Sequence, residues 1–369
     1  MTAFRLGINV RFARAHITGV QRFAREITKR LCQLADVVLL APHGAEPPVP
    51  GVPVRHGRLR GHAWEQLELP RLARAAACDA TLHLSGTAPI HGGPHVMVTH
   101  DVLPLTNPEW YTRRFARWYG AVLPRAMRRA AGIITVSERS RHEILRVLGA
   151  PRRLAVVTQG LAPFDRPASR EAVERVATSL GLPDRFLLAV GHGDPRKNHG
   201  FLTTVLSELD RRGEAVALLI VGAATGRVYA TAEPARGTGV RVLGRVSDET
   251  LHALYSSATA MCFPSLAEGF GRPPLEAAAC GTPALVADLP AVAEPARAAG
   301  LVLPLDPARW ADAVQSLMRD ARQRAAAVAR GRAAAVALRW DSAAAQVLEA
   351  CLSASPRHDA RPELVTSGV

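Results

Sequence analysis

The segment PSLAEGFGRPPLEAAACGTPALVAD, residues 264–288, places two glutamates, Glu268 and Glu276, on either side of a Gly-Phe-Gly turn. The apolar run before it predicts a buried strand. The proline pair after the turn favours a helix start, where the missing N–H groups cost nothing. This order leaves backbone N–H groups at a helix N-terminus, which is an anion site that fits a phosphate.

Two carboxylates beside that turn repel each other unless a ligand with hydroxyl groups or positive charge binds there. Glu276, about one turn into the helix, points back to the helix start and can accept hydrogen bonds from a ribose diol. Glu268 precedes the turn and can hold sugar hydroxyls or a developing positive charge. The pattern therefore predicts a nucleotide-sugar site; the alternative is a capped helix with a surface glutamate.

A second segment, LLAVGHGDPRKNHG at residues 187–200, runs from a strand through a glycine-rich turn at Gly191 into a helix start. Arg196 and Lys197 lie where a leaving diphosphate needs neutralising, since arginine gives paired hydrogen bonds and lysine a compact charge. Lys197 is one of only two lysines among 46 basic residues. A glycine-rich loop alone is a weak signal, but it gains weight beside the first segment.

The first half of the chain carries two further candidates. His100 and Asp101 follow the apolar run HVMV, and residues at the carboxyl end of a parallel strand face the ligand cleft. A hydrogen-bonded structural histidine is the alternative. Gly19, in TGVQRFAREI, lets a ligand approach the backbone closely, and a plain turn glycine explains it equally well.

Apolar runs separated by longer helical patterns indicate an α/β fold of parallel sheets covered on both faces. We expect two Rossmann-like domains with a cleft between them: residues 1–163 as an N-terminal acceptor domain and 164–338 as a C-terminal donor domain. Residues 339–353 are expected to form a helix, and 354–369 a flexible tail. The runs that suggest strands are RLGINV, VVLLAP, HVMVTHDV, GIITVS, RLAVVTQG, RFLLAVG, VALLIVG, TAMCFPS and PALVAD.

Charge is distributed unevenly along the chain. The net charge is +14, and residues 1–160 hold 22 arginines, one lysine and only ten acidic residues. Such asymmetry suggests an anionic partner surface, membrane or nucleic acid; an arginine-rich composition with solvated helix faces is the alternative. The stretch 108–131 mixes five aromatic residues with six arginines. It predicts either a helix lying on anionic lipid or a core helix with a charged outer face.

The sequence lacks the motifs of several kinds of functional site. Five scattered cysteines without a C-x-x-C pair indicate reduced thiols in a cytoplasmic protein. No secretory leader, membrane-spanning run or RNA-binding motif is evident, so we expect no nucleic-acid partner. No D-x-D, H-E-x-x-H or phosphate-binding P-loop is found, and we expect no metal or other cofactor.

The segments EGFGRPPLE, GDPRKN, VTHDVLPLTNPEW, TVSERSRHEIL, LGRVSDETLHALYSSA and PLDPARWADAV occur in an order that resembles the retaining glycosyltransferases of family 4, which have the GT-B fold. The resemblance covers about residues 4–353. It implies a nucleotide-sugar donor in the second domain and an acceptor in the first. It also implies that the final helix crosses back to the first domain.

The resemblance further assigns roles. Arg196 and Lys197 would neutralise the donor diphosphate, Glu276 would hold the ribose, and Glu268 would contact the transferred sugar. The turn at 269–271 would contribute Gly269 and the N–H groups of Phe270 and Gly271, with Val246 near the base and His100 near the sugar. The predicted catalytic set is therefore Glu268, His100, Arg196 and Lys197. The predicted donor-binding set adds Gly19, Gly191, Val246, Gly269, Phe270, Gly271 and Glu276.

The expected activity is a metal-independent, retaining transfer of a hexose to a lipid-linked or oligosaccharide acceptor in O-antigen, capsule or exopolysaccharide synthesis. The segment HDVLPLTNPEWY is most similar to mannosyltransferases, which favours GDP-mannose as donor. The basic first half suits peripheral association with the inner face of the plasma membrane. The alternatives are a GT-B nucleotide-sugar epimerase, which would need more cleft carboxylates than Asp101, and a non-catalytic basic binding protein.

Overall fold

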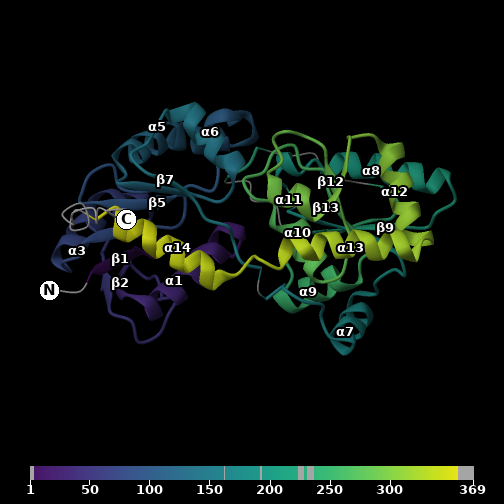
Figure 1. Ribbon diagram of the computed structural model, residues 1–369, viewed down its shortest axis with the longest axis horizontal. Coiled ribbons are helices and arrows are strands. Elements are labelled where there is room, and N and C mark those ends of the chain that lie inside the picture. Colours follow the sequence, from purple (N-terminus) through teal and green to yellow (C-terminus); the bar gives the residue numbers. More distant parts are fainter. Residues whose placement is uncertain (1–3, 162, 192, 223–227, 231–236, 356–369) are drawn as a thin grey trace, which may run out of the picture.

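The structure, a computed structural model, describes residues 4–161, 163–191, 193–222, 228–230 and 237–355. These residues form two α/β domains that lie side by side along the long axis of the molecule (Figure 1). Each domain is built on one sheet in which all the described strand pairs are parallel.

The sheet of the first domain has seven strands in the order β3-β2-β1-β4-β5-β6-β7. Parallel pairing requires each connection to return to the start of the sheet. Helices lie between β1 and β2, β3 and β4, β5 and β6, and β6 and β7, whereas non-helical connections join β2 to β3 and β4 to β5. The strands are β1 (Arg5–Asn9), β2 (Asp36–Ala41), β3 (Val54–His56), β4 (Ala80–His83), β5 (His95–Val98), β6 (Gly132–Thr135) and β7 (Leu154–Val156). The helices are η1 (Arg11–Arg14), α1 (Gly19–Leu34), α2 (Gly61–Ala63), η2 (Trp64–Glu68), α3 (Leu69–Ala75), α4 (Leu103–Thr106), η3 (Pro108–Trp110), α5 (Arg113–Arg129) and α6 (Glu138–Leu148).

The sheet of the second domain has six strands in the order β10-β9-β8-β11-β12-β13. They are β8 (Phe186–Val190), β9 (Ala217–Val221), β10 (Val240–Gly244), β11 (Ala260–Phe263), β12 (Ala284–Ala287) and β13 (Gly300–Leu303). The helices that follow β7 are α7 (Arg170–Leu180), η4 (Pro195–Lys197), α8 (His199–Arg211), α9 (Asp248–Ser257), α10 (Arg272–Ala279), α11 (Glu294–Ala299), α12 (Pro307–Arg319), α13 (Ala321–Ala335) and α14 (Trp340–Ser353).

The apolar runs correspond to strands, but four strands were not among them: β3, β4, β10 and β13. Strand β4 is instructive because it is buried along its whole length beside β1. Its residues Thr81 and His83 are polar and hydrogen-bonded to each other at 3.0 Å, so the sequence lacks the continuous apolar run of a buried strand. The segment between the two sheets contains helix α7.

Helix α14 lies on the first domain against α1, although it follows the last helix of the second domain (Figure 1). Trp340, Val347 and Cys351 of this helix are buried in the same core cluster as strands β1 and β4. The chain therefore crosses between the domains twice. The tail assigned to residues 354–369 begins too early, because Ala354 and Ser355 are buried after the helix ends; residues 356–369 lie outside the described part.

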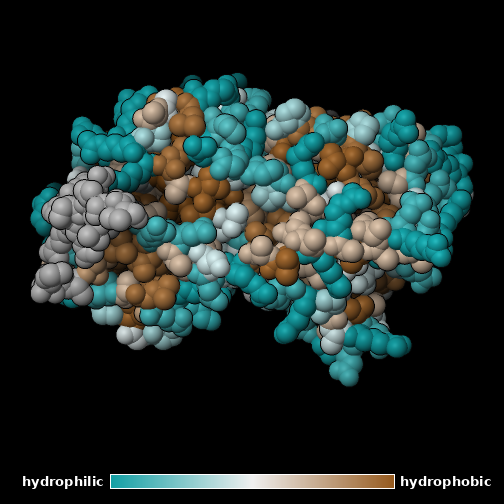
Figure 2. Space-filling view, in the orientation of Figure 1, coloured by the Kyte–Doolittle hydropathy of each residue, from teal (hydrophilic) through white to brown (hydrophobic). Residues whose placement is uncertain are grey.

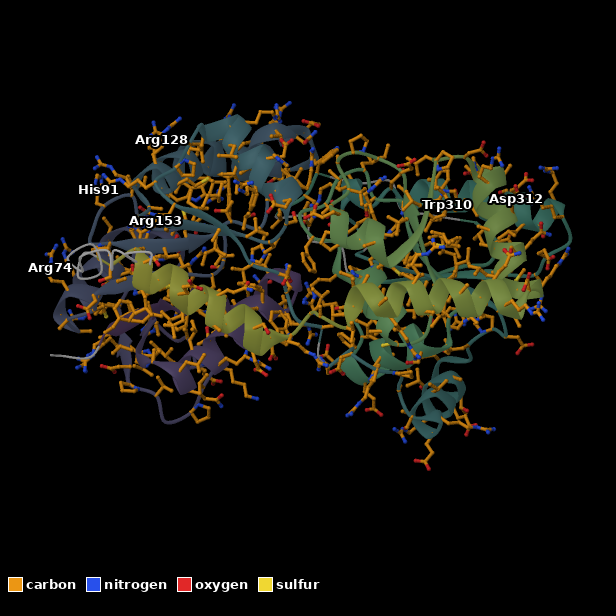
Figure 3. All side chains as sticks on the ribbon, viewed as in Figure 1. Arg74, His91, Arg128, Arg153, Trp310 and Asp312 are labelled. Carbon is orange, nitrogen blue, oxygen red and sulfur yellow. The ribbon has the colours of Figure 1, made fainter. Side chains whose placement is uncertain are left out.

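The outer surface is polar and basic. Figure 2 shows mostly hydrophilic residues at the rim of this face and apolar residues toward the middle of each domain. Arginines such as Arg74, Arg128 and Arg153 project at the outside of the first domain (Figure 3). No helix among the described residues combines the length and apolar character needed to span a bilayer.

Candidate active site

The Gly-Phe-Gly turn joins β11 to α10 at the boundary between the domains. Gly271, the N-cap of α10, has φ 82° and ψ 58°, a left-handed conformation that favours glycine. A Cβ at Gly269 would lie 2.6 Å from the carbonyl oxygen of His100. The Gly269 carbonyl also accepts hydrogen bonds from Ser137 Oγ at 2.5 Å and Ser140 Oγ at 3.1 Å. The first domain thus packs directly on this turn, and only glycine fits there.

Lys197 and Glu268 form an ion pair inside the site, with 2.7 Å between Lys197 Nζ and Glu268 Oε1. Both side chains are largely buried, and the ammonium group also lies 5.0 Å from the ring centre of Phe263. The lysine stem crosses Gly191, where a Cβ would lie 2.8 Å from Lys197 Cε. Gly191 has φ 110°, so glycine is required for both the turn and the lysine.

Arg196 is buried and held by a bidentate contact with Asp194, 2.7 Å from Nη2 to Oδ2 and 3.1 Å from Nε. Burial raises the pKa of Asp194, but the Arg196 charge and hydrogen bonds outweigh burial, and the pKa is lowered. The guanidinium also faces Tyr229 and lies 3.9 Å from Asp101 Oδ2. Burial raises the pKa of Asp101, and the Arg196 charge opposes this.

Glu276 lies 5% exposed near the start of α10, and both of its oxygens have partners. Oε1 accepts hydrogen bonds from Arg272 Nη2 at 2.7 Å and Nε at 3.0 Å. Oε2 accepts one from the Tyr255 hydroxyl at 2.8 Å. The tyrosine and the arginine hold the carboxylate in one orientation.

Arg272 is the residue of this site that sequence reasoning missed. It is 7% exposed, and it donates hydrogen bonds from Nη1 to the carbonyl of Gly160 at 2.7 Å and to Gln159 at 3.3 Å. Its guanidinium lies 5.3 Å from the ring centre of Trp340. The chain first crosses between the domains at residues 159–160 and crosses back at Trp340. Arg272 therefore contacts both crossing segments as well as Glu276. The sequence did carry a signal for this residue, which is a charged side chain between Gly271 and the proline pair.

His100 lies at the end of β5 with its ring edge-on to Phe23, 5.1 Å between ring centres. Its Nε2 is buried and has no hydrogen-bond partner among the described residues. Burial lowers the pKa of His100 to about 4, and the charge of Arg272 acts in the same direction. The imidazole is therefore neutral near pH 7 and keeps one nitrogen available for a ligand.

The other predicted residues are Gly19, Phe270, Gly271 and Val246. Gly19 begins α1 in the first domain, and a Cβ there would lie 3.5 Å from Arg272 Cδ. The Phe270 side chain is buried against Val136 and Leu275, while the N–H groups of Phe270 and Gly271 have no partner in the described part of the chain. Val246 lies in the loop between β10 and α9 and packs on the core cluster that contains Tyr255 and Phe263.

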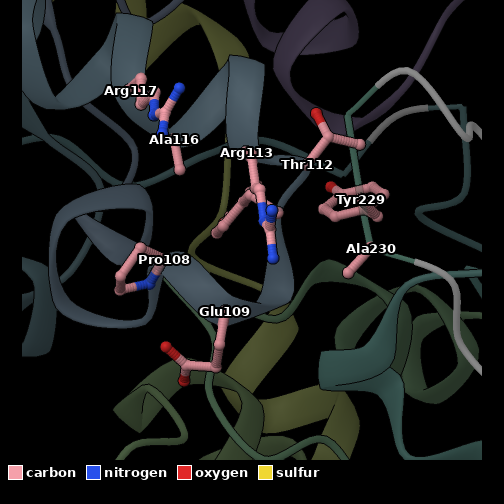
Figure 4. A pocket seen from close by; sticks show the side chains of 9 residues that line it. Pro108, Glu109, Thr112, Arg113, Ala116, Arg117, Tyr229 and Ala230 are labelled. Carbon is pink, nitrogen blue, oxygen red and sulfur yellow. The ribbon is translucent and has the colours of Figure 1, made fainter.

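Asp101 and Glu268 border a small cavity at the site. The space between Asp101 and Glu268 measures about 10 Å³, which is room for about one water molecule. A larger pocket of about 670 Å³ lies outside it, between the start of α5 and Tyr229 (Figure 4). None of the predicted donor residues lines that pocket. The pocket residues are Pro108, Glu109, Tyr111, Thr112, Arg113, Ala116, Arg117, Tyr229 and Ala230.

We expect the free energy of unfolding to decrease as the pH falls below about 6.5. Burial lowers the pKa of His83 from 6.5 to about 3, so between these values the unfolded chain binds a proton that the folded chain does not. Stability then rises with pH by up to about 1.4 kcal/mol per pH unit for such a group. Urea unfolding at a series of pH values measures this slope.

The slope should become shallower in His83→Asn and stay unchanged in His91→Asn, because His91 is exposed. Equal slopes in the two variants would contradict the prediction.

Among the described residues, no three His, Cys, Asp or Glu side chains gather closely enough to hold a metal ion. The site combines the cations of Arg196, Lys197 and Arg272 with the carboxylates of Glu268 and Glu276 and the N-terminus of α10. Such a set can bind an anion and a polyhydroxylated group side by side.

Residues 17–163 match the family described as "Glycosyltransferase Family 4", and residues 172–334 match "Glycosyl transferases group 1". The "O-antigen chain mannosyltransferase B" of Escherichia coli is 30% identical over 367 residues, which cover 90% of this chain and 96% of that protein. The chain belongs to the family 4 glycosyltransferases.

Other relatives of this glycosyltransferase match part of it. The "O-antigen chain mannosyltransferase RfbU" of Salmonella typhimurium is 25% identical over 224 residues, covering 60% of each chain. The "Serotype-specific mannosyltransferase WbdA" of Escherichia coli is 31% identical over 225 residues, covering 53% of this chain but 26% of that protein.

Solved structures share the fold over nearly the whole chain. The glycosyltransferase WaaG, "involved in lipopolysaccharide biosynthesis", has a TM-score of 0.70 at 16% identity, with 94% of this chain and 99% of that one covered. Anabaena HepE, in complex with UDP and glucose, also has a TM-score of 0.70, at 17% identity and 94% and 98% coverage. The two parallel-sheet domains of this glycosyltransferase form the GT-B fold.

Proposed function

We propose that this glycosyltransferase transfers a hexose from a nucleotide sugar with retention of configuration and without a metal ion. The observation that carries the proposal is the pair of buried contacts on either side of the Gly269–Gly271 turn, Lys197 with Glu268 and Arg272 with Glu276. A diphosphate competes for the lysine, and sugar and ribose hydroxyls compete for the two carboxylates. A single nucleotide sugar can therefore bind all the groups whose contacts with each other it breaks.

The proposed reaction breaks the bond between the sugar C1 and the diphosphate oxygen and forms a bond from C1 to an acceptor oxygen. Arg196, Lys197 and the N–H groups of Phe270 and Gly271 stabilise the negative charge of the departing diphosphate. The acceptor attacks from the face that the diphosphate leaves, and its proton passes to a phosphate oxygen. His100, neutral near pH 7, offers its unpartnered Nε2 to the sugar.

We infer that the donor is GDP-mannose and that the acceptor is a lipid-linked saccharide of O-antigen, capsule or exopolysaccharide synthesis. The support is the names of the relatives, which are O-antigen mannosyltransferases. Family membership favours a transferase over the epimerase and over the non-catalytic binding protein.

A melting-temperature panel with GDP-, UDP-, dTDP- and ADP-sugars tests the donor. A ligand present at about one hundred times its Kd stabilises the folded protein by about 2.7 kcal/mol. We expect GDP-mannose to raise Tm by several degrees, and the product anomer, read by NMR, to keep the donor's configuration. A shift with UDP-glucose alone would replace the proposed donor, and an inverted product would reject retention.

We further propose that helix α5 holds the first domain on an anionic membrane surface. The helix carries six arginines and no acidic residue between positions 113 and 129, and all six are exposed. Each basic residue near such a surface contributes about 1 kcal/mol to binding. Cosedimentation with vesicles containing phosphatidylglycerol should be lost when Arg114, Arg125 and Arg128 are changed to glutamine. Equal sedimentation of this variant and the parent would reject the proposal.

A further inference from the structure

A buried cluster of polar groups lies in the first domain, apart from the donor residues. Its centre is Glu65, whose side chain is fully buried. Glu65 Oε1 accepts hydrogen bonds from Asn9 Nδ2 at 2.9 Å and Arg11 Nε at 3.2 Å, and Oε2 contacts His62 Nδ1 at 3.2 Å. Thr87 donates to Oε2 at 2.8 Å and accepts a hydrogen bond from Arg11 Nη2 at 2.8 Å.

Local backbone geometry brings Glu65 to this position. Residues 61–75 form one continuous helical segment that is interrupted by the π-helical turn η2, Trp64–Glu68. Such turns are rare and recur at functional sites. The turn buries the carboxylate, whereas Arg11 and His62 keep 20% and 30% of their side chains exposed. Glu65 thus holds two groups that reach the surface.

The cluster lies at the edge of the sheet where ligands bind. Asn9 and His83 are register partners at the carboxyl ends of the parallel strands β1 and β4, and ligands of parallel sheets bind beyond these ends. Asn9 Nδ2 lies 3.1 Å from His83 Nδ1, and this contact holds the Asn9 side chain in place. From His83 the chain reaches Thr87 within four residues, passing Leu84, whose backbone is hydrogen-bonded to His100.

Aromatic rings cover the exposed side of the cluster. The Trp118 ring lies 4.9 Å from the His62 ring, and 38% of Trp118 is exposed. Tyr119 lies beside Arg11; burial raises the pKa of the tyrosine, and the Arg11 charge only partly opposes this. A run of ring contacts then leads through Phe115 to Tyr111 at the boundary with the second domain.

We propose that Arg11, His62 and Trp118 form a subsite for a neutral sugar unit of the acceptor, with Glu65 as the positioning residue that holds Arg11 and His62. The proposal rests on the proposed function and names the part of the acceptor that this domain reads. Paired polar groups bind vicinal hydroxyls, and an exposed aromatic ring covers the apolar face of a sugar ring.

Charge decides the ligand class. The carboxylate of Glu65 neutralises Arg11 within the cluster, so Arg11 itself offers no excess positive charge to a phosphate. A purely structural core would gain as much from apolar residues of the same volume, because a buried ion pair often contributes nothing to stability.

Binding of two saccharides tests the subsite directly. Saturation-transfer NMR would compare an α-linked mannotriose with mannose 6-phosphate, on the full chain and without donor. We expect mannotriose to bind, and Trp118→Ala and His62→Gln each to weaken its Kd about tenfold. Trp118→Phe should restore part of the affinity. The control is Leu34→Ala, an exposed apolar residue at the end of α1, far from the strands' carboxyl ends.

The donor is measured in the same samples. The Tm shift with GDP-mannose should stay unchanged in Trp118→Ala and His62→Gln, which separates this subsite from the donor proposal. A parent protein that shifts with no nucleotide sugar but binds mannotriose would reject only the donor. Unchanged mannotriose binding in both variants, no binding in the parent, or tighter binding of mannose 6-phosphate would overturn the subsite.

Discussion

Replacing Lys197 by alanine is expected to lower kcat for sugar transfer by about 10²–10³-fold, the effect of removing one preorganised group that stabilises a developing negative charge. The ammonium lies 2.7 Å from Glu268 and 5.0 Å from the Phe263 ring, so its position is set before the donor arrives. Steady-state kinetics with donor and acceptor varied separately gives kcat and KM.

Lys29→Ala is the matched control, because Lys29 is the only other lysine of the chain and lies exposed on α1. It should leave both constants unchanged. Lys197→Arg should recover little activity, since the stem crosses Gly191 at van der Waals contact and a planar guanidinium needs more room. Activity close to the parent in Lys197→Ala would remove this residue from the reaction.

Replacing Arg272 by methionine is expected to destabilise the protein by about 3–5 kcal/mol, because it leaves the buried carboxylate of Glu276 without its cation. The change also removes the hydrogen bond to Gly160 and the contact with Trp340, so the two crossings lose a shared partner. Thermal unfolding should show a decrease in Tm of about 2–4 °C for each kcal/mol lost.

The double variant Arg272→Met with Glu276→Gln should recover part of that loss, since the uncompensated charge is gone, and the cycle measures the coupling of the pair. Arg297→Ala serves as the control. Its contact with Asp288 measures 2.8 Å but is about a third to a half exposed, so about 0–1 kcal/mol is expected. Equal stability of the Arg272→Met and Arg297→Ala variants would contradict the stabilising role of the Arg272–Glu276 pair.

The fold class could be predicted from local pattern because a strand buried on both faces needs a continuous apolar run. Strand β11 and its neighbours follow this rule. Strand β4 does not, since Thr81 and His83 satisfy each other inside the sheet. Thr81 and His83 lie two positions apart in β4, and a hydrogen bond between them leaves no periodic apolar pattern that would reveal the strand in a single sequence.

Within the site, the sequence by itself determined the groups that sit on one short segment. The strand, glycine turn and helix of residues 260–279 form by local rules, so Glu268, Glu276 and the free N–H groups follow from their spacing. Arg196 and Lys197 follow in the same way from the turn after β8. These residues, with the glycines that carry them, also place the chain in its family.

Only the tertiary structure decided which groups these residues meet. The contact of Arg272 with Gly160 joins residues 112 positions apart, and that of Glu65 with Asn9 spans 56. Both depend on strand register and on how the two domains pack. A charged residue next to a turn carries the same local pattern whether it ends in water or in a buried pair. The burial that distinguishes the two outcomes arises only when distant segments meet.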